Sequence, residues 1–363
     1  MIRHSSLLVL ALAAAPALAA SSSPRYFSTL GDTALFVAHD AVSGRELWRS
    51  DGTAEGTYLL ADVCPGQCHG NPYGVATAGG LFYFHVTTSD DFFYSRQALW
   101  VTDGTAEGTR ELVPLTSAGN TTWLPKQGFL YFEGRDNYTG GELWRTNGTP
   151  EGTGLVTEIT IADLRGGPDE ITAFQNRVWF VADDGRGPDL WVSNGTERGT
   201  SRFFDPGKGT PIFLRALGKR LVFVVLDGKQ TRLWATDGKT TAPVTPAFDG
   251  MFAIGSSRHF GGQLVFVAYD PRRGQEIWIT DGTARGTRTL TAFARAEPFS
   301  STVFPESPLA GRFLFMANDG SHGMELWITD GTPRGTRLLR DLCPGACSGV
   351  LDLLGVHRGL LWF

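Results

Sequence analysis

Several features that would point to common protein classes are missing from this 363-residue sequence. Beyond residue 19 no apolar run is long enough to cross a bilayer, so we expect no membrane span. No basic run is present, and 32 Lys and Arg face 37 Asp and Glu, for a net charge of −5. A nucleic-acid partner would need a basic surface, so we expect none.

Common enzyme motifs are missing as well. The sequence holds no Gly-x-Ser-x-Gly elbow, no His-Glu-x-x-His pair and no P-loop. Its histidines recur at no fixed register, and a lone histidine is more often a surface or hydrogen-bonded residue than a catalyst. We therefore assign no catalytic residue and favour a protein that is not an enzyme.

The first residues have the pattern of a secretory signal peptide. A short basic start, "MIRH", precedes an apolar, Ala-rich run, and Ala17-Leu18-Ala19 fits the small-x-small cleavage rule. We expect residues 1–19 to be this signal, and residues 20–363 to be secreted, periplasmic or held at the cell surface.

The main feature of the sequence is one phrase that occurs seven times. "ELWRSDGTAEGT" at 46–57 returns in variants such as "EIWITDGTARGT" at 276–287, and the copies lie 43 to 52 residues apart. Such a period indicates a repeat architecture. Each copy carries one tryptophan: Trp48, Trp100, Trp144, Trp191, Trp234, Trp278 and Trp327.

Each unit predicts four antiparallel strands. A short run comes first, then a β-branched and aromatic run around a phenylalanine, then x-Leu-Trp-x-Thr, then the residues after the last Gly-Thr. Four strands every 40–50 residues are typical of a propeller blade. We predict an all-β propeller of seven four-stranded blades. Residues 349–363, "GVLDLLGVHRGLLWF", predict a half blade. Either it packs as an incomplete eighth blade, or the chain is a piece of a longer, eight-bladed protein, and we favour the second alternative.

The repeated phrase predicts the corner between the third and fourth strands. Leu and Trp alternate along the third strand, and we expect each Trp to be buried between blades. Asp-Gly should end the strand, and the second Gly should give a type I turn its left-handed exit. A ligand role for the Asp is the alternative, but Asn147 and Asn194 replace it in two copies, which favours the turn.

A second acidic pattern, Asp-x-x-x-Gly-x-Glu/Asp, precedes the Trp in five copies. These carboxylates should share one rim. Either the Asp caps backbone N–H groups while the Glu bonds a neighbouring strand, or the acidic rim binds Ca²⁺ or a cationic partner. No cofactor is otherwise expected. The candidate metal ligands are Asp40, Asp136, Asp183, Asp270 and Asp319.

Only four cysteines are present, in the matched segments "DVCPGQC" and "DLCPGAC". Four thiolates could bind zinc, but the spacing is wider than the usual Cys-x₂-Cys and the protein is expected to be exported. Two local disulfides are therefore favoured, Cys64–Cys68 and Cys343–Cys347.

At Glu-Leu-Trp-x-x-Asp-Gly-Thr the chain resembles the bacterial ELWxxDGT repeat proteins, sometimes called hyalin-like. The match is clearest at 46–53, 142–149 and 325–332, and the fifth copy departs from it, with Arg232 and Lys239. The resemblance implies an exported repeat protein, and it transfers no catalytic residue.

These observations favour a non-catalytic binding or scaffold propeller, expected to be monomeric, for a glycan or protein partner. A secreted polysaccharide hydrolase or lyase that uses carboxylates of the propeller channel is the alternative.

Overall fold

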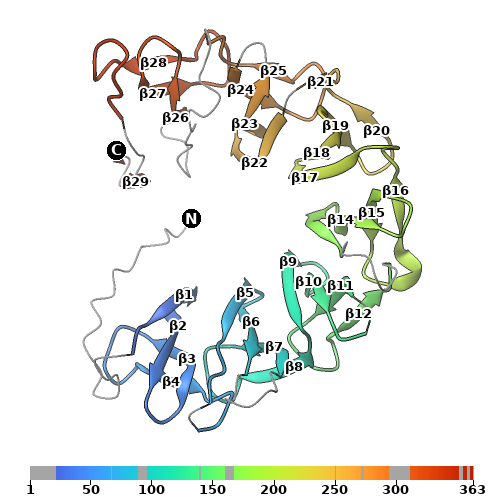
Figure 1. Cartoon of the computed structure of the whole chain (residues 1–363), viewed down its shortest axis with the longest axis vertical. Coiled ribbons are helices and arrows are strands. Elements are labelled where there is room, and N and C mark those ends of the chain that lie inside the picture. Colours follow the sequence, from blue (N-terminus) through green and yellow to red (C-terminus); the bar gives the residue numbers. More distant parts are fainter. Residues whose placement is uncertain are drawn as a thin grey trace. The chain divides into compact units, whose positions relative to one another are not determined.

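The computed structural model describes residues 22–66, 68–88, 96–138, 140–159, 167–249, 251–270, 274–293, 311–350, 355–357 and 360–362 (Figure 1). The expected signal peptide, residues 1–19, lies outside them. By internal contacts the chain divides into two units. Unit 1 holds residues 1–186 and 192–201, and unit 2 holds 187–191 and 202–363.

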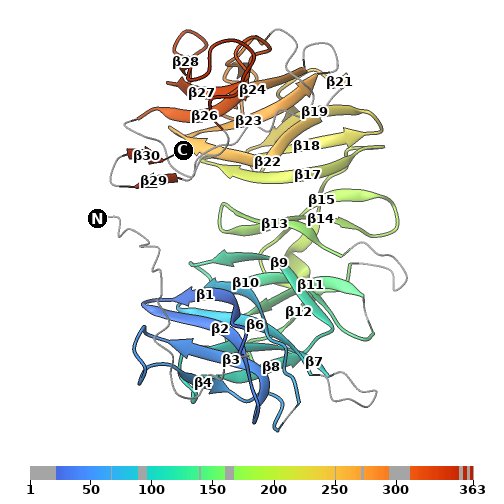
Figure 2. The same cartoon turned by 60° about the vertical axis from the view of Figure 1, so that its left-hand side comes forward.

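Unit 1 contains three consecutive four-stranded antiparallel sheets, each in simple chain order (Figure 2). The first is β1 (Arg25–Leu30), β2 (Thr33–Asp40), β3 (Gly44–Ser50) and β4 (Tyr58–Ala61). The second is β5 (Tyr73–Ala78), β6 (Leu81–Thr87), β7 (Gln97–Thr102) and β8 (Arg110–Pro114). The third is β9 (Ser117–Leu124), β10 (Phe129–Arg135), β11 (Gly141–Thr146) and β12 (Gly154–Thr157).

The fourth sheet has the same order and contributes residues to both units. It is β13 (Asp169–Phe174), β14 (Arg177–Asp183), β15 (Pro188–Ser193) and β16 (Thr200–Phe204), with a short 3₁₀ turn η1 (Glu197–Gly199) before β16.

Unit 2 repeats the pattern. Its first sheet is β17 (Thr210–Leu217), β18 (Arg220–Asp227), β19 (Gln230–Thr236) and β20 (Thr241–Pro243), with β21 (Phe248–Asp249) also paired to β19. The next is β22 (Met251–Phe260), β23 (Gln263–Asp270), β24 (Gly274–Thr280) and β25 (Arg288–Thr289). The seventh is β26 (Phe313–Asn318), β27 (Met324–Thr329) and β28 (Arg337–Arg340).

The predicted all-β propeller fold is confirmed, because a four-stranded antiparallel sheet in chain order is a propeller blade. In the seventh blade three strands are described, and any first strand would fall in 294–310, outside the described residues. A two-stranded sheet follows, β29 (Gly355–His357) with β30 (Leu360–Trp362), where the half blade was expected. In the described part of the chain, no helix is both long and apolar enough to span a bilayer.

The repeated Phe and Trp are direct cross-strand partners. Phe36 faces Trp48, and Phe266 faces Trp278, with their ring centroids 6.5 Å apart. Aromatic pairs opposite one another are a main source of sheet stability. All seven phenylalanines are buried: Phe36, Phe84, Phe132, Phe180, Phe223, Phe266 and Phe315.

The prediction that every repeat Trp is buried was wrong in part. The residue before it is buried in all seven copies, as Leu or Ile, but only Trp48 and Trp144 are buried among the tryptophans, and the other five are partly exposed. The aliphatic side chain lies in the core between neighbouring sheets. Indole is large and is seldom covered completely, so it reaches the edge of the blade.

A β-bulge recurs between the first and second strands. In the first six sheets the register shifts at or beside the repeat Phe. The extra residue in the first strand, opposite the Phe, increases the twist of that strand and redirects one of its side chains. Four non-glycine bulge residues have positive φ: Tyr26, Asn120, Glu170 and Phe213.

Candidate functional site

The Asp-Gly-Thr phrase folds into a corner held by its own hydrogen bonds. Oδ1 of Asp51 accepts from the amide and hydroxyl of Thr53, at 2.9 and 2.7 Å. The Thr53 hydroxyl accepts from the amide of Gly56, and the Ser50 and Thr57 hydroxyls are 2.7 Å apart. The hydrogen bond from the Thr53 hydroxyl is the main cause that lowers the pKa of Asp51. Only Oδ1 is used, so Asn fits equally well.

The two glycines of the corner have different roles, and the expected left-handed exit at the second one was wrong. Gly52, directly after the Asp, has a φ of 93°, whereas Gly56 has no positive φ. A Cβ on Gly56 would lie 2.0 Å from Oδ1 of Asp51. The second position therefore needs Gly because the Asp carboxylate leaves no room for a Cβ there. The backbone φ of this Gly does not require it.

The fifth copy departs from the repeat in sequence, and its corner is shorter than the others. Asp237 accepts from the amides of Lys239 and Thr240, and the Thr236 hydroxyl donates to the Thr240 carbonyl four residues later. The second Gly is absent because this shorter turn brings no backbone under the carboxylate.

An arginine of one blade binds the corner of the next. Nη1 of Arg49 lies 2.7 Å from the carbonyl oxygen of Gly104, and Arg145 repeats the bond to Gly195. In unit 2, Nη2 of Arg288 donates to the carbonyl of Gly331 at 2.8 Å. The repeated phrase is thus structural in two ways, since it ends a strand and joins neighbouring blades.

The second carboxylate of the acidic pattern does not lie on a rim, contrary to expectation. It is buried in all five copies. The four glutamates accept hydrogen bonds from the segment after the fourth strand, whereas Asp189 pairs with Arg202 of the fourth strand itself, at 3.1 Å. Glu325 accepts from the amides of Leu342, Cys343 and Gly349. Paired backbone amides are what a buried carboxylate needs. The five residues are Glu46, Glu142, Asp189, Glu276 and Glu325.

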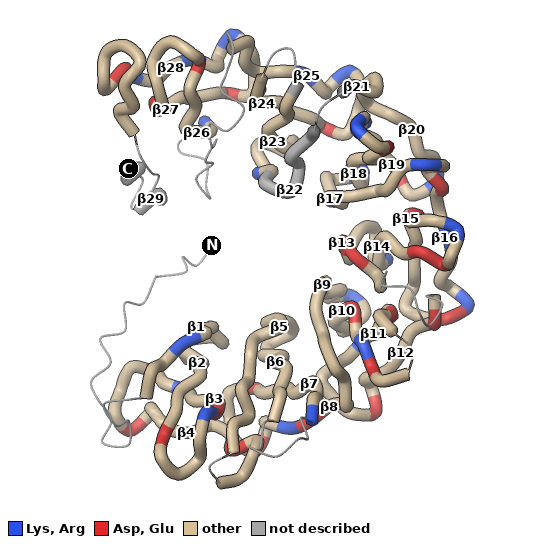
Figure 3. Tube along the Cα trace, viewed as in Figure 1, with Lys and Arg blue, Asp and Glu red and all other residues tan. Residues whose placement is uncertain are grey.

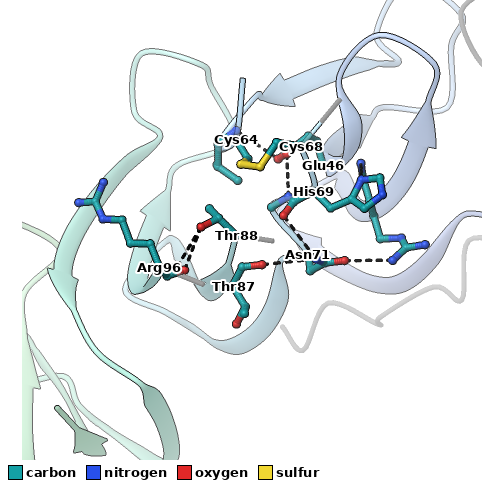
Figure 4. Close-up of a disulfide and its surroundings, with 11 residues drawn as sticks. Glu46, Cys64, Cys68, His69, Asn71, Thr87, Thr88 and Arg96 are labelled. Atoms are coloured by element: carbon teal, nitrogen blue, oxygen red, sulfur yellow. Dashed lines mark hydrogen bonds between the residues drawn. A yellow bond between two sulfur atoms is a disulfide. The ribbon is translucent and has the colours of Figure 1, made fainter. Parts of the chain in front are cut away.

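Both cysteine pairs form the predicted disulfides, Cys64–Cys68 and Cys343–Cys347, and this leaves no thiolate for zinc. Figure 4 shows the first disulfide beside Glu46 and His69. Glu46 accepts from the amide of Gly70 at 2.9 Å. Burial raises the pKa of Glu46 to about 8, although amide hydrogen bonds act in the opposite direction.

The disulfide loop lies directly on the third strand. The Arg45 amide donates to Nδ1 of His69, and the Arg45 guanidinium donates to Oδ1 of Asn71 at 3.0 Å. A Cβ on Gly44 would lie 2.1 Å from the carbonyl oxygen of Cys68. Glu46, the disulfide and this contact together form a cap on the first blade, and Glu325 anchors its counterpart on the seventh.

The candidate metal ligands cap backbone groups. Oδ1 of Asp40 accepts from the amides of Val42 and Ser43, and Asp136 and Asp183 each accept from the amide two residues on. The side chain of Asp270 lies outside the described residues. No group of three or more His, Cys, Asp or Glu side chains suited to a metal occurs among the described residues.

Asp319 differs from the other candidates because it lies in a pocket with Trp327. The pocket has a volume of about 490 Å³, and its wall combines rings, hydroxyls and one carboxylate. Phe293 packs edge-on against Trp327, with ring centroids 4.9 Å apart. The polar residues that line it are Thr289, Thr291, Asp319, Ser321 and Thr336.

His322 pairs with the carboxylate of this pocket. Nδ1 of His322 lies 2.8 Å from Oδ2 of Asp319, while Oδ1 accepts from the amides of Ser321 and His322. Asp319 raises the pKa of His322. Partial burial would raise the pKa of Asp319, but the histidine and the two amides outweigh it and the net shift is downward. The sequence predicted Asp319 as a candidate metal ligand and Trp327 as a structural residue of the repeat. No sequence pattern predicted that both would line one pocket.

No family model matches the chain, and no curated protein does. Solved structures are similar in fold. A puromycin hydrolase is 13% identical with a TM-score of 0.42, over 82% of this chain and 59% of that one. A structure from a study of two prolyl endopeptidases is 10% identical with a TM-score of 0.48, over 83% and 48%. The chain therefore spans about half to three-fifths of the length of these two proteins.

The β-propeller domain of the Trilobed protease from Pyrococcus furiosus is matched over nearly its whole length. It is 12% identical with a TM-score of 0.43, over 88% of this chain and 97% of that one. At these identities the likeness concerns the fold alone, and the activities named for the three proteins are properties of those proteins.

Proposed function

We propose that this chain is an exported, non-catalytic propeller that binds a glycan. The observation that carries the proposal is the pocket at Asp319 and Trp327. Its rings suit the C–H faces of a sugar, and its hydroxyls and carboxylate suit the sugar hydroxyls. A volume of about 490 Å³ lies within the range of roughly 300–1,000 Å³ that small-ligand sites occupy.

The remaining acidic residues favour binding over catalysis. A carboxylate-based hydrolase needs one carboxyl group free to transfer a proton and a second one facing the substrate. Here the strand carboxylates accept backbone amides, as Glu325 does, and the turn carboxylates cap the chain, as Asp40 does. Two disulfides support export, because such bonds persist in oxidising compartments.

A glycan array tests the proposal directly. Purified protein is applied with and without Ca²⁺, beside the variants Asp319→Asn and Ser321→Ala. We expect both substitutions to weaken the wild-type signal, since each changes a polar group of the pocket wall.

Asp183→Asn is the matched control, because Asp183 holds the same kind of turn through Oδ1, and the pocket does not include it. If both pocket variants bind the glycan like the wild type, the binding site is not this pocket. Binding that requires Ca²⁺ would restore the metal hypothesis for the turn aspartates.

A further inference from the structure

One end of the blades in unit 2 carries an excess of positive charge. In an antiparallel blade, the turn between the first two strands and the corner between the last two lie at the same end. In the fifth, sixth and seventh blades these segments hold eight Lys and Arg against three Asp, although the whole chain has a net charge of −5. The segments are residues 218–220, 237–241, 261–263, 281–288, 311–312 and 330–337. We call this surface the cationic end, and its cations are Lys219, Arg220, Lys239, Arg285, Arg288, Arg312, Arg334 and Arg337.

The three blades contact one another at this end, so its cations share one surface. A Cβ on Gly282, in the sixth corner, would lie 2.8 Å from Cδ of Arg220 in the fifth blade. The guanidinium of Arg288 donates to the carbonyl of Gly331, in the seventh corner, at 2.8 Å. The cationic end therefore continues from the fifth blade to the seventh.

Most of these cations are exposed, and the acids beside them are bound within their own turns. Asp281 and Asp330 each accept from the amide and hydroxyl of the Thr two residues on. The exposed cations are Lys219, Lys239, Arg285, Arg312, Arg334 and Arg337. Among the described residues, none of these exposed cations forms an ion pair. They can therefore bind an external anion without first losing a partner.

The corresponding segments of the first three blades have the opposite charge. Residues 31–33, 51–58, 79–81, 103–110, 125–129 and 147–154 hold six carboxylates and two cations. Glu55 and Glu107 there take the place of Arg285 and Arg334. Since the corner accepts either sign, its folding does not require the positive charge of unit 2.

The cationic end borders the pocket at Asp319. Pro333 and Thr336 of the seventh corner line this pocket, and Arg334 lies between them in the chain. The carboxylate of Asp319 itself pairs with His322. A polymer held in the pocket would therefore meet the cations of the corner as it leaves.

We propose that the cationic end binds an acidic polysaccharide, a glycan whose sugars carry carboxylate or sulfate groups. The inference rests on the proposed function, which makes the ligand a glycan, and the surface charge adds its class. Guanidinium groups bind such oxyanions through paired hydrogen bonds. A polymer with repeated anions can contact several blades at once, which raises its affinity without any strong single contact.

Binding of the full chain to matched polymers tests the proposal by titration calorimetry. The anionic probes are polygalacturonate and dextran sulfate, and their neutral counterparts are methyl-esterified polygalacturonate and dextran. We expect one anionic probe to bind, more weakly as salt is added, and neither neutral counterpart to match it. The probe that binds identifies carboxylate or sulfate.

The combined substitutions Arg285→Glu and Arg334→Glu should weaken this binding about tenfold, because two attractions become repulsions. Both place the Glu of the first three corners at the same position, so the corner should still fold. Lys208→Glu combined with Arg340→Glu is the control. It makes the same change of charge at exposed residues near the opposite end of the blades, and it should leave binding unchanged.

The outcomes separate this inference from the proposed function. Equal losses in both double variants, or no binding of either anionic probe, would refute the cationic end. Double-stranded DNA bound as tightly as the polysaccharide would refute its assignment to a glycan. If only Asp319→Asn weakens binding, the pocket stands and the cationic end is wrong. If only the corner variant does, the cationic end stands and the pocket is not the glycan site.

Discussion

The carboxylate of Asp51 occupies the space that a side chain on Gly56 would need, with 2.0 Å between Oδ1 and an ideal Cβ. Five further corners repeat this relationship within about 0.1 Å, including Asp330 over Gly335. The repeat therefore keeps Gly for a steric reason.

Gly335→Ala should lower the free energy of unfolding by about 2 kcal/mol, because the Asp330 side chain must leave its hydrogen bonds to Thr332. Urea denaturation measures the change. Gly154→Ala is the control, since a Cβ there meets no atom within 4 Å. Equal effects of the two substitutions would refute the steric explanation.

Glu325→Gln should destabilise the seventh blade by about 1–3 kcal/mol. Both carboxylate oxygens accept amide N–H groups, and the NH₂ of glutamine would turn one acceptor into a donor facing a donor. Thermal unfolding measures the loss, and Glu55→Gln, an exposed corner residue, should change the stability by less than about 0.5 kcal/mol. If Glu325→Gln left the stability unchanged, these hydrogen bonds would contribute nothing to it.

Arg288→Ala should cost about 1–2 kcal/mol, because it removes the charged hydrogen bond from the sixth blade to the carbonyl of Gly331. Arg285→Ala, three residues earlier and exposed, is the matched control for loss of charge. Denaturation curves that shift equally for both would show that charge matters here and the bond between blades does not.

The pair His322–Asp319 predicts a pH dependence. The raised pKa of His322 contributes stability below the ordinary value of about 6.5, which is lost as the pH rises through the raised pKa. The lowered pKa of Asp319 contributes stability above about 3.8, which is lost as the pH falls through the lowered pKa.

The melting temperature of wild type should thus exceed that of His322→Gln at about pH 5.5, and the gap should close by about pH 9. Melting curves across this range check the prediction. A gap that persists at the alkaline end would contradict the proton linkage and assign the effect to packing.

Much of the fold could be predicted because it depends on local patterns. Strand alternation and the Asp-Gly corner act within a dozen residues, the Phe and Trp recur once in every unit, and the structure confirms these features. The sequence allowed the Glu of the acidic pattern to bond a neighbouring strand, but its burial and its partner were not predicted, because Glu46 binds an amide 17 residues away, in Val63. Yet the separation is also 17 residues at Glu142 and Glu325, so a constant offset across copies was available as a signal.

The candidate site was harder to predict for a related reason. Asp319 and Trp327 occupy repeat positions shared by several blades, so their sequence context looks structural. What makes a pocket there is the particular set of neighbours, such as Phe293 from the preceding blade.

In the six corners that keep the second Gly, the residue before it takes no part in the hydrogen bonds that hold the corner, so its charge can vary. The residue before the second Gly is exposed, and it is Glu55, Glu107 and Glu151 in the first three copies. It is Arg198, Arg285 and Arg334 in the fourth, sixth and seventh. Figure 3 colours the acidic and basic residues along the traces of both units. A chain of similar blades can thus change from acidic to basic corners along its length without a change of fold. Such corners can therefore differ in surface charge between repeat proteins of the same architecture.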